Sequence, residues 1–109
     1  MIRNVNNLRE LIEKVKENND TYTTITSHFE FLMKERIKIT QNSLRTIIGR
    51  PEKEIDKPRL IASVKKINEI AESSGVDFHI DEDWESIEAF LRMSTMEDIA
   101  GEFQKQANS

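Results

Sequence analysis

Residues 56–76, DKPRLIASVKKINEIAESSGV, carry the clearest helical pattern in the chain. Apolar residues recur there at the three-and-four spacing of one helix face, namely Leu60, Ile61, Val64, Ile67 and Ala71. Asp56 is placed to cap the helix, Pro58 suits its first turn, and Gly75 suits a left-handed C-terminal residue. We expect this helix to lie at the centre of the fold.

Other segments on both sides also have helical periodicity. We expect helices over residues 5–18, from a capping box at Ser27, from Thr40 to a stop at Gly49, through Trp84 to Leu91, and from a second capping box at Ser94. The predicted core positions of the second and third of these segments include Ile37, Leu44, Ile47 and Ile48. Residues 21–26 are rich in strand-forming threonine, and residues 76–80 alternate between apolar and polar side chains.

These segments predict an all-α fold, a compact single domain spanning residues 1–109. We expect five to six short helices packed orthogonally or as a bundle. The alternative is an α+β fold whose small sheet uses residues 21–26, 36–40 and 76–80.

Composition narrows the possible chemistry. The chain has 109 residues, no cysteine and only three glycines. The missing thiols exclude disulfides, zinc–thiolate sites and thiol catalysis. No window approaches the length of a membrane span, so we expect a cytoplasmic protein that does not insert into a membrane.

Charge is unevenly distributed along the chain. The net charge is −4, yet residues 1–60 carry +3 and residues 61–109 carry −7. Ten basic and four acidic residues lie between Lys34 and Lys66. A weakly acidic protein therefore has a basic middle segment.

The stretch HIDEDWESIE, residues 79–88, places the only tryptophan among the densest run of carboxylates. The simplest interpretation is that Asp81 or Asp83 caps a helix whose first turn favours negative charge, with Trp84 packed at the core or its rim. An EF-hand is excluded because Ser86 occupies the position that requires glycine. A looser metal site from His79, Asp81 and Asp83 is a weaker alternative, and we expect no metal and no cofactor.

The same stretch could anchor a basic surface of another protein, or of a second copy of the chain. The candidate partner-binding residues are Asp81, Glu82, Asp83, Trp84, Glu85 and Glu88.

The basic middle segment supports a second hypothesis, binding to nucleic acid. Its candidate residues are Lys34, Arg36, Lys38, Arg45, Arg50, Lys53 and Arg59. Residues 39–49, ITQNSLRTIIG, and 67–76, INEIAESSGV, resemble the second and fourth helices of helix-turn-helix domains of the Cro and phage-repressor type. The resemblance implies a recognition helix between them, but residues 50–57 are short, acidic and closed by Pro58.

Signals for catalysis are missing from the sequence. The two histidines, His28 and His79, lie in no recognisable nucleophile motif, and no glycine-rich phosphate loop occurs. We therefore expect a small non-catalytic protein that binds another protein as an inhibitor, immunity factor, adaptor or regulator. The alternative is a regulator that binds nucleic acid.

Overall fold

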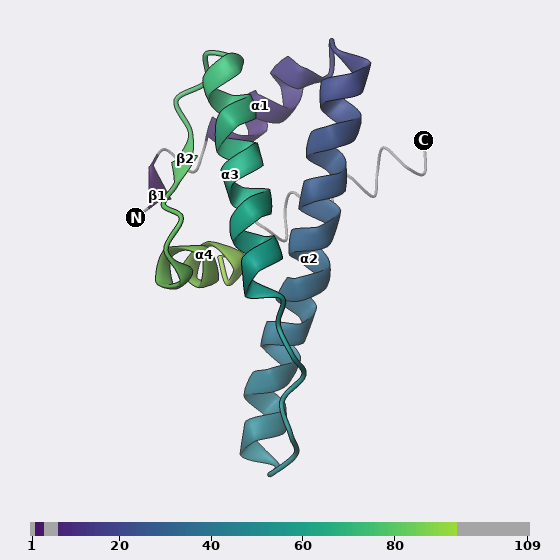
Figure 1. Cartoon of the computed structure of the whole chain (residues 1–109), viewed down its shortest axis with the longest axis vertical. Helices are drawn as coiled ribbons and strands as arrows, with labels where there is room; N and C mark the ends of the chain where they lie inside the picture. The colour runs from purple at the N-terminus through teal and green to yellow at the C-terminus, as the bar shows by residue number, and fades with distance from the viewer. Residues whose placement is uncertain (1, 4–6, 94–109) are drawn as a thin grey trace.

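The computed structural model describes residues 2–3 and 7–93, and helices dominate this part of the chain (Figure 1). The helices are α1 (Leu8–Val15), α2 (Asn19–Ile47), α3 (Lys57–Ser73) and α4 (Trp84–Leu91). The all-α class is thus confirmed, with four helices in the described residues where five to six were expected for the whole chain. The expected helix from Ser94 lies outside the described residues.

Helix α2 is one continuous helix of 29 residues, where the sequence suggested a strand-like stretch followed by two helices. Its threonine and serine hydroxyls donate to carbonyl oxygens one turn earlier, and so tolerate the helical backbone. Thr23 Oγ1 lies 2.9 Å from the Asn19 oxygen, and Ser27 Oγ lies 3.0 Å from the Thr23 oxygen. The capping box at Ser27 is therefore wrong, because that residue lies inside the helix.

The expected break at Thr40 is wrong for the same reason. The Thr40 hydroxyl donates to the Arg36 oxygen at 3.1 Å, inside α2. The helix ends near Gly49, as predicted, where φ is +74° and the Arg50 amide donates to the Arg45 oxygen at 2.8 Å. At 1.5 Å per residue, α2 is about 44 Å long.

The α+β alternative is also wrong, because residues 21–26 and 36–40 are helical. In the described chain, the only sheet pairs β1 (Ile2–Arg3) with β2 (His79–Ile80) in antiparallel register, with Ile2 opposite Ile80. The alternating residues 76–80 thus contain a two-residue strand, His79–Ile80, whose partner was not foreseen.

Helix α3 begins and ends where the sequence predicted. The Asp56 side chain accepts from the Arg59 amide at 3.2 Å, and Pro58 lies in the first turn. Gly75 has a φ of +71°, and the Val76 amide donates to the Ala71 oxygen at 3.0 Å. The helix packs against α2, α4 and β2, which makes it central to the packing (Figure 1).

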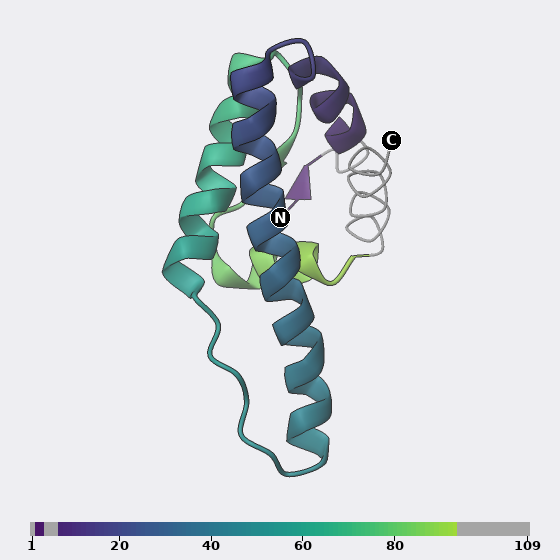
Figure 2. The same ribbon diagram turned by 90° about the vertical axis from the view of Figure 1, so that its right-hand side faces the viewer.

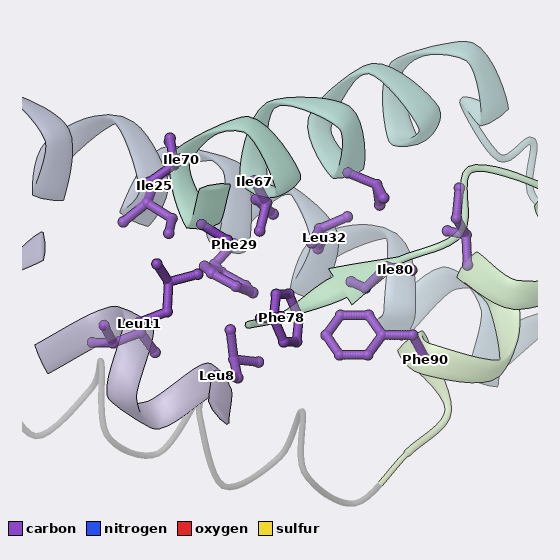
Figure 3. Packing of buried hydrophobic residues seen from close by; sticks show 14 of the residues in the cluster. Leu8, Leu11, Ile25, Phe29, Leu32, Ile67, Ile70, Phe78, Ile80 and Phe90 are labelled. Carbon is purple, nitrogen blue, oxygen red and sulfur yellow. The ribbon is translucent and has the colours of Figure 1, made fainter. Parts of the chain in front are cut away.

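The hydrophobic core draws side chains from all four helices and from the segment around β2 (Figure 3). Phe29 of α2 and Phe90 of α4 are fully buried, and the rings of Phe78 and Phe90 meet edge to face with centroids 6.3 Å apart. None of the described helices is long and apolar enough to cross a membrane.

The segment that contains β2 is held against α3 by a buried asparagine. Asn68 Nδ2 donates to the Ile80 oxygen at 2.8 Å, and the Ile80 amide donates to Asn68 Oδ1 at 3.0 Å. One side chain thereby satisfies both backbone groups of one residue. We call this arrangement an asparagine clamp.

Candidate protein-binding arm

The carboxylates of residues 81–88 have mainly local partners. Asp83 caps α4 by accepting from the Ser86 amide at 3.0 Å, and this hydrogen bond lowers the pKa of the Asp83 carboxyl. Glu82 lies 3.8 Å from Lys65, and Asp81 lies 3.4 Å from His79. The prediction that Asp81 or Asp83 caps this helix is confirmed, with Asp83 as the cap.

Trp84 is half-buried against the core, as expected. The Lys57 ammonium lies 4.9 Å from the centre of its ring, a cation–π contact. Trp84, Glu88 and Ile39 are among the residues that line a groove of about 420 Å³ between α4 and α2. Trp84 therefore forms a wall of this groove and does not project as an isolated anchor.

Most of the candidate nucleic-acid-binding cations stabilise the fold. Arg36 Nε donates to the Leu91 oxygen at 2.7 Å and ties α2 to α4. Lys38 pairs at 3.1 Å with Glu35, which is 3% exposed. The Arg59 guanidinium lies 4.1 Å from the centre of the Phe31 ring.

Two more of these cations, Arg45 and Lys53, hold the connection between α2 and α3. Arg45 Nε donates to the Pro51 oxygen at 2.6 Å, and Lys53 Nζ donates to Gln41 Oε1 at 2.7 Å. Within the described part of the chain, the side chains of Lys34 and Arg50 make neither hydrogen bonds nor ion pairs. They are the two members of the set whose charge is fully available to a partner.

The implied helix-turn-helix geometry is wrong for this segment. Residues 39–47 are the end of the straight α2, and residues 50–56 form a non-helical connection that runs back along it (Figure 2). No recognition helix lies between α2 and α3.

The distal end of α2 and this connection project beyond α3 and α4 (Figures 1 and 2). We call residues 37–56 the arm. A second asparagine clamp holds it together, since Asn42 Nδ2 donates to the Lys53 oxygen at 2.8 Å and the Lys53 amide donates to Asn42 Oδ1 at 2.7 Å. Thr46 Oγ1 also donates to Glu52 Oε1 at 2.6 Å. The connection is thereby fixed in place.

The arm exposes four large aliphatic side chains. The exposed fraction is 56% for Ile37, 60% for Leu44, 80% for Ile47 and 54% for Ile48. The prediction that these residues belong to the core is wrong, because α2 continues past the elements that cover it nearer its N-terminus. Clustered exposed aliphatic residues on a projecting element make the arm a candidate interaction surface.

Sequence reasoning missed both asparagine clamps and the outward-facing arm. The available signal was a polar residue on an apolar helix face: Asn42 follows Ile39 by three positions, and Asn68 follows Val64 by four. Its backbone partner, eleven or twelve residues away, could not be read from the pattern.

A second hollow, of about 630 Å³, lies between α3 and the segment leading into β2. Its lining includes the acidic residues Glu69, Glu72 and Glu82 together with His79. Across residues 2–3 and 7–93, no three histidine, aspartate or glutamate side chains are grouped so as to hold a metal ion.

His28 faces α3, with its Nδ1 3.2 Å from the Ser63 hydroxyl. Burial, followed by the charges of Lys66 and Arg59, lowers the pKa of His28. In the unfolded chain the imidazole binds a proton near pH 6.5, whereas the folded chain resists protonation. The free energy of unfolding is therefore expected to fall as the pH drops through about 6.5 toward the lower folded-state pKa.

Urea denaturation at a series of pH values checks this expectation. His28→Gln should flatten the stability profile in this pH range. An unchanged slope in His28→Gln would contradict it.

Comparisons with protein-family models, with curated proteins and with solved structures found no match to this chain.

Proposed function

We propose that this chain is a small non-catalytic protein that binds another protein as an inhibitor, adaptor or regulator, and that the arm is its binding surface. The observation that carries the proposal is the exposure of Ile37, Leu44, Ile47 and Ile48 on the arm, at 54–80% of each residue. Burying such side chains stabilises a complex by roughly 25 cal/mol for each Å² of apolar surface removed from water.

The bracing of the arm supports the proposal. The Asn42 clamp and the bonds from Arg45 and Thr46 hold the connection along α2, so the helical end stays ordered while it presents apolar side chains. A pre-ordered surface lowers the entropic cost of association. A cytoplasmic location, which the lack of cysteine favours, belongs to the same proposal.

The carboxylates of residues 81–88 become a secondary contact in this proposal. Asp83 caps α4 and Asp81 lies beside His79, so both have local roles in the absence of a partner. The alternative function, nucleic-acid binding, rests on Lys34 and Arg50, whose side chains have no local partners among the described residues.

A pull-down from native lysate, divided into nuclease-treated and untreated halves, tests the proposal. The wild-type chain is expected to retain a protein partner after nuclease treatment, and Leu44→Glu is expected to lose it, because a charge replaces an apolar contact. Ala62→Glu is the matched control, since it adds the same charge at an exposed position of α3.

Circular dichroism should show unchanged helix content in both variants, because both positions are exposed. Retention of the partner by Leu44→Glu would contradict binding through the arm. Recovery that disappears with nuclease would favour the alternative.

A further inference from the structure

The exposed aliphatic residues of the arm follow a heptad spacing. Ile37, Leu44 and Ile48, with Gln41 between them, are separated by four, three and four residues. This is the spacing of the a and d positions that helices use to pair with one another. Ile47 lies along one edge of this stripe. The surface is therefore shaped for another helix.

The opposite edge of the stripe is basic. At 100° per residue, Lys34, Lys38 and Arg45 follow one another along that edge, and Arg50 lies beyond the end of the helix. Between Glu30 and Glu52 the only carboxylate is that of Glu35, which is buried and paired with Lys38. The outer face of this helical segment thus carries positive charge without an exposed carboxylate, although the whole chain carries −4.

Charge argues against a second copy of the arm as the occupant. In an antiparallel pair, the a and d layers would match Ile37 with Ile48 of the second copy and bring Lys38 beside its Arg45. In a parallel pair, Lys34 would face Lys34. Like charges at these positions oppose pairing.

The apolar stripe likewise argues against nucleic acid, because nucleic-acid interfaces are polar and such a ligand would leave these aliphatic side chains without apolar partners. We propose that the arm pairs with an amphipathic helix of a protein partner whose apolar face is edged by carboxylates. The inference rests on the proposed function and names the chemistry of its partner.

Two synthetic three-heptad peptides test the inference. Both carry Ile at a and Leu at d; one carries Glu at every e and g position and the other carries Lys there. Like charges keep either peptide from pairing with itself. Fluorescence anisotropy of each labelled peptide, titrated with the full chain, should show binding to the Glu peptide at least about tenfold tighter than to the Lys peptide, a difference of about 1.4 kcal/mol.

A variant with reversed charges on the arm tests whether its basic residues cause the preference for the Glu peptide. Lys34→Glu combined with Arg50→Glu is expected to remove the preference, because it reverses two of the four positive charges on this edge, and both side chains are exposed and make no hydrogen bond or ion pair to the described chain. Leu44→Ser should weaken binding of both peptides, and Ala62→Glu should change neither. High salt should weaken the Glu peptide's binding to the wild-type chain.

Equal binding of the two peptides, or binding of neither, would overturn the inference. So would a wild-type chain that forms a Leu44-dependent dimer in sedimentation equilibrium, or one whose arm binds labelled duplex DNA more tightly than the Glu peptide. The proposed function can hold when this inference fails. A Leu44-dependent protein partner in the pull-down, together with equal binding of the two peptides, would support binding through the arm and would contradict only the inference that the partner is an acidic-edged helix.

Discussion

Asn68→Leu is expected to lower the free energy of unfolding by about 3 kcal/mol, although leucine resembles asparagine in size and suits a helix. Asn68 is 9% exposed and bonds both backbone groups of Ile80, at 2.8 and 3.0 Å. Leucine offers neither a donor nor an acceptor, so two buried backbone groups lose their partners, each at a cost of about 1–3 kcal/mol. Since small domains are stable by about 5–15 kcal/mol, the loss is a large fraction of the total.

Urea denaturation followed by circular dichroism measures this change. Glu69→Ala, at an exposed neighbouring position, is the control and should alter stability by less than about 0.5 kcal/mol. A loss of that small size in Asn68→Leu would show that the clamp contributes little.

Asn42→Ala is expected to release the connection of the arm. It removes the two bonds to Lys53, at 2.7 and 2.8 Å, from a residue that is 8% exposed. The projecting end of α2 lies beyond α3 and α4, and an unsupported helix end frays. We expect a loss of about 1–2 kcal/mol in overall stability and a larger local effect.

Native-state hydrogen exchange measures the local effect on the connection of the arm. The Lys53 amide, whose acceptor is Asn42 Oδ1, should lose most of its protection, whereas amides in the middle of α3 should change only as much as global stability does. Gln41→Ala is the control, because it removes a single exposed bond to the Lys53 ammonium. Undiminished protection of the Lys53 amide would show that the other contacts of the arm suffice.

Local signals were sufficient to predict α3 and α4. Asp56 caps α3, Asp83 caps α4, and Gly75 follows the end of α3. The signals that set these helix ends therefore lie within a few residues of them. The same kind of local signal failed in α2. Ser27 and Thr40 are good caps, yet in a helix with enough buried contacts their hydroxyls bond to the preceding turn and the helix continues.

The candidate site could not be predicted from hydrophobic periodicity. Leu44 and Ile48 have the periodicity of a buried face, and periodicity records which residues share a face but not whether another element covers it. The sequence also could not show which basic side chains have partners within the chain. Arg36 and Lys53 do, whereas the side chains of Lys34 and Arg50 make no hydrogen bond or ion pair to the described residues.

The two asparagine clamps also determine how freely parts of this sequence can change over evolutionary time. Asn42 and Asn68 bond the amide and carbonyl of Lys53 and Ile80, groups that every residue except proline possesses. The clamp therefore constrains the asparagine strictly and leaves the identity of the residue at position 53 open. Related chains could vary the connection of the arm, and with it the choice of partner, while its path along α2 stays the same.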